Sequence, residues 1–347
     1  MRKIIDFRSD TCTLQPEEML KAMVNAKVGD EYYDDDPTIN ELLDLSCEIM
    51  DKEAALFTAS GTMNNLIAIL TQTKRGNIII AEDESHVPWC EGSNIAAFGG
   101  VIPKLIKGRL GIMDVTDIEA AILSRPKGYD AAEYKLLVVE NAHTWGTCTT
   151  PEQMAAYRKV ADKHGLNIHV DGARIFNAAV ALDVKPSKLA KDADTLGFCL
   201  SKGLSCPFGG VLVGSKEIIS RARHYKQILG AGFRQAGYMA ACGVYALNNM
   251  VDRLAEDHEN AKLLAKGLVE LGMEIDMNSV QINMVFFSSP PSLIDLHEFY
   301  KKMTMIEGIK MIPPEENHGK IRLATHWGIE KEDIEYFLKK AKEVVNS

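Results

Sequence analysis

Short runs of aliphatic and β-branched residues recur through the first two thirds of the chain. The clearest lie at residues 77–81, 135–140, 166–171 and 209–214. Continuous apolar runs of this length, bounded by polar residues or glycine, are typical of strands that are covered on both faces. The sequence therefore predicts at least four buried strands.

The clearest helix lies between two of these runs, in the sequence TPEQMAAYRKVADKHG. Thr150 suits the N-cap, Pro151 suits the first turn, and Gly165 suits the position after the last turn. A strand, this helix and the next strand form a βαβ unit, which favours parallel pairing with helices on the faces of the sheet. We therefore expect an α/β fold with a mostly parallel sheet.

The pattern changes after about residue 250. A charged amphipathic helix ends near Gly272, the loop SSPPS follows, and KEDIEYFLKKAKEVV predicts a final helix. This is typical of a smaller α+β domain. The expected division is an N-terminal segment that joins the small domain (1–20), a large domain (21–248) and a small C-terminal domain (249–347).

Composition narrows the class of protein. The 347 residues are 46% hydrophobic and 25% charged, as in ordinary folded chains. A net charge of -9 disfavours nucleic acid as a partner. The start has no signal-peptide pattern, and no apolar run is long enough to cross a membrane.

Cysteine usage favours a reducing compartment. The seven cysteines are dispersed and form no CxxC pair, so we expect buried thiols in a cytoplasmic protein. Cys199 and Cys206 have no partner at metal-ligand spacing, and we therefore expect no metal site.

Two candidate catalytic residues follow consecutive apolar runs. Asp171 ends one run, and Lys202 follows the next one, in LSKGLSCPFGG. The carboxyl ends of parallel strands are where α/β sheets bind ligands, so both side chains can face one pocket. A desolvated lysine is a nucleophile toward an aldehyde, and pyridoxal phosphate (PLP) sites pair such a lysine with an acid at the pyridine nitrogen. The alternative for Asp171 is a helix N-cap.

Other segments could complete a PLP site. In FTASGTMNNLIAIL, the first turn of a helix at Gly61 can bind a phosphate, and the hydroxyls of Thr62 and Ser60 are candidates to assist. His86 follows a predicted strand and could stack on a flat ring. Arg174 and Arg322 could bind a substrate carboxylate in a two-bond fork. Each feature alone is as compatible with a cap, a structural histidine or a surface ion pair.

These residues also resemble a family, the PLP-dependent L-threonine aldolases of fold type I, the aspartate aminotransferase-like class. The likeness is carried by DFRSDT, VGDEYYDDDPTINELL, ASGTMNN, DESHV, ENAHT, HVDGARIFNAAV, LSKGL, FRQAG and IRLATHW. It implies a seven-stranded, mostly parallel sheet in the large domain. It also implies a homodimer or homotetramer whose sites are shared between subunits.

The resemblance implies a role for each matching residue. Lys202 would form the Schiff base with PLP, Asp171 would meet the pyridine nitrogen, and His86 would stack on the ring. His143 of ENAHT would lie near the substrate β-hydroxyl.

The remaining residues that match the family would bind the phosphate of PLP and the carboxylate of the substrate. Gly61 and Thr62 would hold the phosphate, which Arg234 of FRQAG would reach from a neighbouring subunit. The substrate carboxylate would be bound by Ser9, Arg174 and Arg322.

The activity implied by the resemblance is cleavage of a β-hydroxy-α-amino acid, such as L-threonine or L-allo-threonine, to glycine and an aldehyde. The base that takes the β-hydroxyl proton would be His143, His86 or a water that one of them orients. The chain departs from the family pattern after Lys202 and at Trp145, so β-elimination or transamination of another amino acid stays open. A non-catalytic α/β binding module is the alternative from another class.

Overall fold

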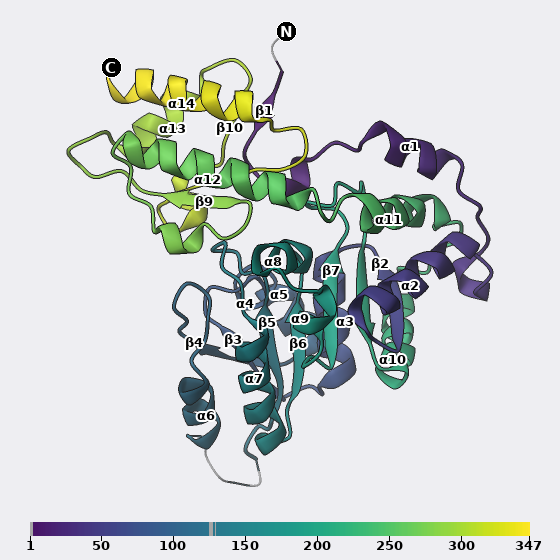
Figure 1. The fold of residues 1–347 in the computed structure, drawn as a ribbon. Helices are drawn as coiled ribbons and strands as arrows, with labels where there is room; N and C mark the ends of the chain where they lie inside the picture. The colour runs from purple at the N-terminus through teal and green to yellow at the C-terminus, as the bar shows by residue number, and fades with distance from the viewer. Residues whose placement is uncertain (1–2, 125–127, 129) are drawn as a thin grey trace.

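A seven-stranded sheet forms the centre of the larger part of the protein (Figure 1). The structure is a computed structural model that describes residues 3–124, 128 and 130–347. The strand order is β2-β8-β7-β6-β5-β3-β4. β8 runs antiparallel to β2 and β7, and the other neighbours are parallel. The strands are β2 (Ala54–Thr58), β3 (Ile78–Glu82), β4 (Ile102–Ile106), β5 (Tyr134–Glu140), β6 (Asn167–Asp171), β7 (Thr195–Cys199) and β8 (Gly210–Gly214).

Helices cover both faces of this sheet. The α-helices of this part are α1 (Glu17–Val24), α2 (Pro37–Met50), α3 (Gly61–Gln72), α4 (His86–Cys90), α5 (Gly92–Asn94), α6 (Val115–Leu123), α7 (Pro151–His164), α8 (Ile175–Leu182), α9 (Pro186–Ala190), α10 (Lys216–Ile228) and α11 (Gly237–Asn249). Short helical turns of other types are η1 (Asp10–Cys12), η2 (Glu31–Tyr33) and η3 (Ile95–Gly99). The predicted α/β fold with a mostly parallel sheet is confirmed.

Strand β5 shows why its sequence is apolar without interruption. Leu136 and Val138 pack on one side with Ile69 of α3, whereas Leu137 packs on the other side with Met154 of α7. Because successive side chains of a strand point to opposite faces, a strand covered on both sides needs apolar residues at every position. The four predicted strands match β3, β5, β6 and β8 to within one residue at each end.

Local sequence signals set the ends of α7 as predicted. The Thr150 hydroxyl accepts from the Gln153 N–H, and the Gln153 side chain accepts from the Thr150 N–H, which together satisfy two donors of the first turn. Gly165 ends the helix in the left-handed conformation, at φ 67°.

A second hydrophobic core lies above the sheet, in the part of Figure 1 that holds both chain ends. It joins Ile5 and Phe7 to residues of the last hundred positions, including Leu264 and Phe337. Strand β1 (Ile5–Asp6) pairs with β10 (Ile309–Lys310), and β9 (Met284–Phe287) pairs with β11 (Ile321–Ala324). The helices are α12 (Leu254–Glu270), η4 (Met277–Ser279), α13 (Leu296–Thr304), η5 (Pro314–Asn317) and α14 (Lys331–Val345).

This core supports our division of the chain, in which residues 1–20 join a small domain of residues 249–347 and residues 21–248 form the large domain. The boundaries remain our proposal, and residues 1 and 2 lie outside the described residues. In the described part of the chain, no helix has both the length and the apolar character needed to cross a membrane.

Helix α3 lies unusually close to the sheet at one glycine. A Cβ built on Gly197 of β7 would lie 2.6 Å from the Cβ of Asn64. The buried Asn64 side chain donates to the carbonyls of Phe198 and Val211 and accepts from the Thr58 hydroxyl. The missing side chain at position 197 therefore lets α3 bond to the sheet backbone.

Replacing this glycine should loosen the contact. We expect Gly197→Ala to lower the free energy of unfolding by about 1–3 kcal/mol, the usual cost of overpacking a core. Gly92→Ala is the matched control, because a Cβ there meets nothing within 4 Å and its φ is not in the left-handed region. Urea unfolding of both variants measures the difference, and equal stabilities would contradict the close contact.

Candidate active site

The carboxyl ends of β6 and β7 bring the two principal candidates to one place. Asp171 is the last residue of β6, and Lys202 follows the end of β7, its parallel neighbour. The buried thiol of Cys199 interacts electrostatically with Lys202, Asp171, Arg174 and Asp10. The structure thus gathers a lysine, an arginine and two carboxylates around the end of β7.

Lys202 lies on a tight turn and is partly buried. Its carbonyl accepts from the Ser205 N–H at 2.8 Å and from the Thr13 hydroxyl at 3.2 Å, and Ser205 itself has a positive φ of 63°. Among the described residues, no hydrogen bond or ion pair engages the Nζ of Lys202. The backbone is therefore fixed while the amine stays available.

The start of α3 approaches the same point. Ser60 caps the helix, and its hydroxyl accepts from the Met63 N–H at 3.2 Å. A Cβ on Gly61 would lie 2.5 Å from the Cys199 Sγ, so only glycine lets this first turn sit against the end of β7. Ser60 does not bind the backbone N–H groups of Gly61 and Thr62 in the same turn, and these two groups are suited to an anion.

His86 begins α4 and is held by an acid. Its Nδ1 lies 2.8 Å from Glu91 Oε1, and its backbone N–H donates to Glu140. Contacts with the Cys90 thiol and with Glu91 raise the His86 pKa to about 10, despite partial burial, and the Asp171 charge adds to this effect. Burial raises the pKa of Glu91, as does the charge of Asp171.

His143 lies deeper than the other candidates. Its side chain is fully buried, with Nε2 at 3.2 Å from Glu82 and at 3.7 Å from Glu140, while Nδ1 receives the N–H of Trp145. Burial lowers the His143 pKa, but the neighbouring carboxylates outweigh it and raise the pKa overall. In this arrangement both ring nitrogens face protein groups.

Arg174 pairs with a carboxylate other than Asp171. Its Nε and Nη2 donate to the two oxygens of Asp10 at 2.7 and 2.8 Å, and Asn283 also donates to Asp10. Burial would raise the pKa of Asp10, but the Arg174 charge overrides it and holds that pKa well below its ordinary value. Arg174 is thus a fixed cation at the edge of the site.

Arg322 is the cation with an unused donor. Its Nη2 donates to the carbonyl of Arg8, but its Nε is buried and has no partner among the described residues. Burial lowers the Arg322 pKa, and the positive charge of Arg174 lowers it further. Two neighbouring cations, the buried Arg174 and the half-buried Arg322 with its free donor, favour an anionic ligand.

Ser9 lies beside other candidate site residues, whereas Arg234 lies away from them. Ser9 caps η1 and accepts from the Thr11 N–H, next to the Asp10–Arg174 pair. Arg234 is largely exposed, 3.8 Å from Asp30 and 5.3 Å from the centre of the Tyr32 ring. Within one chain, none of its contacts reaches the other candidate residues.

These groups fit PLP better than a metal ion. His86, Glu91 and Asp171 each offer an atom within 4.8 Å of the others, which is close enough for one cation. The amide of Asn65, however, donates to both carboxylates, at 3.0 Å to Glu91 and 2.9 Å to Asp171. The available amine of Lys202, the anion-binding turn and the free Arg322 donor suit an aldehyde with a phosphate and a carboxylate-bearing substrate.

Comparison with known proteins agrees with this geometry. Residues 6–290 match the family model described as beta-eliminating lyase. The chain belongs to the beta-eliminating lyase family. A protein of Arabidopsis thaliana named low-specificity L-threonine aldolase 1 is 39% identical over 342 residues, covering 96% of this chain and 94% of that protein. The low specificity L-threonine aldolase of Escherichia coli (strain K12) is 36% identical over 333 residues, covering 95% and 96%.

A solved structure described as Leishmania major threonine aldolase superposes with a TM-score of 0.84 at 22% identity, covering 98% of this chain and 99% of that one. This likeness confirms the fold. The resemblance to the threonine aldolases that the sequence motifs predicted is confirmed by the relatives.

This member of the beta-eliminating lyase family has site residues that the sequence did not single out. Asp10, Asn65 and Glu91 hold Arg174, Asp171 and His86 in place. Asp10 and Asn65 lie inside the recognised motifs DFRSDT and ASGTMNN, but no spacing shows which partner they meet. No sequence pattern marks Glu91 as a site residue, because its contacts with His86 and Asn65 come from tertiary packing alone.

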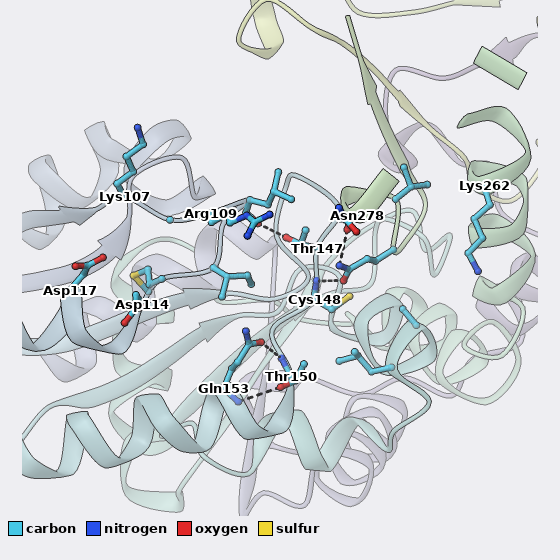
Figure 2. A pocket seen from close by; sticks show the side chains of 18 residues that line it. Lys107, Arg109, Asp114, Asp117, Thr147, Cys148, Thr150, Gln153, Lys262 and Asn278 are labelled. Atoms are coloured by element: carbon cyan, nitrogen blue, oxygen red, sulfur yellow. Dashed lines mark hydrogen bonds between the residues drawn. The ribbon is translucent and has the colours of Figure 1, made fainter. Parts of the chain in front are cut away.

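A separate cavity of about 1030 Å³ lies beside the site (Figure 2). Lys107, Arg109 and Cys148 help to line it, and none of the predicted site residues does. One wall is the loop at Gly111, where φ is 82° and a Cβ would lie 2.1 Å from the His143 ring. Leu110 and Ile112, which flank Gly111 in this loop, line the cavity, whereas Gly111 packs against the His143 ring.

The contact between Glu91 and His86 is testable in the protein without ligands. We expect Glu91→Gln to lower the His86 pKa from about 10 toward its ordinary value of about 6.5, because the Glu91 carboxylate is lost. The Cys90 thiol and the charge of Asp171 also raise the His86 pKa and keep part of the shift, whereas the Glu140 carboxylate binds the His86 backbone N–H. Titration of the imidazole C–H signals by NMR measures the change.

The contact between Glu91 and His86 also makes the stability of the fold depend on pH. Because the folded pKa of His86 is raised, its protonation stabilises the fold fully below about pH 6.5, and this contribution is lost as the pH rises through about 10. Glu91→Gln should flatten that alkaline loss, and an unchanged imidazole titration would contradict the assigned contact.

Proposed function

We propose that this protein is a PLP-dependent aldolase that cleaves a β-hydroxy-α-amino acid of the L-threonine or L-allo-threonine type to glycine and an aldehyde. The observation that carries the proposal is that the available Lys202 amine and the Asp171 carboxylate both interact with the Cys199 thiol, at the ends of two parallel strands. The threonine aldolases among the relatives support the choice of reaction.

PLP, when bound, supplies an aldehyde for the substrate amine and a ring that draws electrons from the Cα–Cβ bond. Lys202 presents the amine that anchors this group. Asp171, fixed by Asn65 and by the Ala173 N–H, presents an anion to the pyridine nitrogen. The first turn of α3 at Gly61 and Thr62 receives the phosphate.

The substrate carboxylate is bound by the Arg322 Nε, which has no hydrogen-bond partner in the described part of the chain. Arg174 adds its charge while Asp10 keeps it in place. Ser9 lies beside this pair and can donate its hydroxyl. Two arginines fix one end of the substrate, so the orientation of its Cα–Cβ bond is set before reaction.

In our proposal the proton of the β-hydroxyl passes to the neutral form of His86, directly or through one water that gives its own proton to the ring. Because the His86 pKa is about 10 without ligands, the His86 ring is mostly protonated at neutral pH, and its minor neutral form is the base. Its Nδ1 contacts Glu91, which leaves Nε2 to face a ligand. His143 supports this region from behind, because both of its nitrogens contact protein groups.

Lys202→Ala tests the proposal directly. Wild-type protein with PLP should be yellow and release glycine and acetaldehyde from L-threonine, and the variant should release none above background, because it lacks the anchoring amine. Borohydride reduction followed by peptide mapping should place the cofactor on position 202 of the wild type. Lys188→Ala, at an exposed site, is the control and should keep full activity.

The products distinguish the rival reactions. Pyruvate with ammonia would indicate β-elimination, and a keto acid would indicate transamination. A colourless protein that does not bind added PLP would contradict the proposed cofactor, and therefore also the proposed aldolase activity.

We further propose that the protein acts as a homodimer or homotetramer with shared sites, in the cytoplasm. The exposed rings of Tyr32 and Tyr33 beside the exposed Arg234 support an interface on this side, because clustered exposed aromatic residues favour association. The seven free cysteines support a reducing compartment.

Subunit complementation tests the shared site. If Arg234 serves the neighbouring subunit, Arg234→Ala and Lys202→Ala should each be inactive alone. A mixed dimer has one site with both residues and one site with neither, so purified mixed dimers should keep about half of the wild-type sites. Activity should be measured on co-expressed, doubly tagged dimers, and no recovery would show that Arg234 does not act across subunits.

A further inference from the structure

Behind Asp171, four buried polar side chains and the half-buried side chain of Gln72 form a continuous series of hydrogen bonds. Gln72 Nε2 lies 2.8 Å from Thr195 Oγ1, which lies 2.9 Å from His169 Nδ1. His169 Nε2 lies 3.0 Å from Asn65 Oδ1, and the Asn65 amide nitrogen reaches Asp171 Oδ2 at 2.9 Å. Asn65 lies on α3, His169 and Asp171 on β6, and Thr195 on β7.

The donors and acceptors of these side chains allow only one direction of donation along this series of hydrogen bonds. The Asn65 amide nitrogen contacts two carboxylates, so both of its hydrogens point to acids and its oxygen must accept from His169 Nε2. His169 Nδ1 is then the acceptor, and the Thr195 hydroxyl donates to it. Burial lowers the His169 pKa to about 4, in agreement with a neutral ring that donates once and accepts once.

The two acids need this shared donor. Asp171 and Glu91 are both nearly fully buried, and their oxygens lie within 4.8 Å of each other. Two like charges at such a distance repel in a low-dielectric interior. A donor amide between them offsets the repulsion, whereas a flipped amide would place its oxygen against both.

We propose that Asn65 is a positioning residue that fixes the orientation of Asp171, and that His169 and Thr195 fix the orientation of Asn65. The proposal rests on the proposed function, since it concerns the partner of the pyridine nitrogen. Asn65 lies one turn beyond Gly61 and Thr62, about 5 Å along the helix axis. A single helix thus sets both the phosphate end and the ring-nitrogen end of the site.

An analogue of PLP tests the role of Asn65 without measuring activity. In 1-deaza-PLP a carbon replaces the ring nitrogen, while the aldehyde and phosphate are kept. Wild-type protein should bind PLP more tightly than this analogue, because only PLP offers a protonated nitrogen to Asp171. Asn65→Ala should reduce that preference about tenfold, the worth of a hydrogen bond to a charged group.

The neighbouring asparagine provides the matched control. Asn64 is equally buried on the same helix, but it bonds only to Thr58 and to sheet carbonyls. Asn64→Ala should weaken the binding of both ligands equally, if at all, and leave the ratio of their Kd values unchanged. Titration of the apoprotein, followed by tryptophan fluorescence, gives both Kd values.

Thr195→Val is a second variant for the case in which Asn65→Ala does not fold. It keeps the shape of the side chain and removes only the hydroxyl that donates to His169. It should reduce the preference for PLP about threefold, because the loss acts on Asp171 through two intervening side chains.

The outcomes separate this proposal from the proposed function. If wild-type protein prefers PLP and neither variant changes the ratio, the positioning role is wrong while the cofactor stands. A loss of affinity for both ligands in equal measure would likewise overturn it, since that reports a structural role. Wild-type protein that binds neither ligand would overturn the proposed function itself.

Discussion

The site depends on the hydrogen bonds that hold the buried carboxylate of Asp171 in one orientation. Burying a carboxylate costs free energy unless hydrogen-bond donors and positive charges offset its desolvation. Here the Asn65 amide and the Ala173 N–H supply the donors, and His86 supplies a nearby positive charge. Without these contacts the carboxylate would not be held toward the ring nitrogen of the cofactor we propose.

Helix α3 connects the contacts of Asp171 to the rest of the fold. Its first turn faces the end of β7, Asn64 bonds to the sheet backbone, and Asn65 bonds to Asp171. Gly61 and Gly197 allow the close approach, because a Cβ at either position would overlap with a neighbour. The position of the turn that we propose for the phosphate and that of the acid are therefore fixed by one element.

The positive charges of the site also depend on buried partners. Arg174 is buried because Asp10 neutralises it with two hydrogen bonds, and Asn283 of the small domain we propose also donates to Asp10. Arg322 keeps one donor unpaired beside it. The arrangement leaves a surplus of positive charge where a substrate carboxylate would lie, at the junction of the N-terminal segment with both parts of the chain.

The sequence by itself determined the elements and the fold class, because periodic burial and helix caps act over a few neighbouring residues. It also indicated Lys202 and Asp171, since both follow apolar strands whose ends must meet at one edge of a parallel sheet. It did not determine that Arg174 binds Asp10, that Glu91 holds His86, or that His143 is enclosed by acids. Those contacts join residues far apart in the chain, and only tertiary packing decides which buried charge meets which partner.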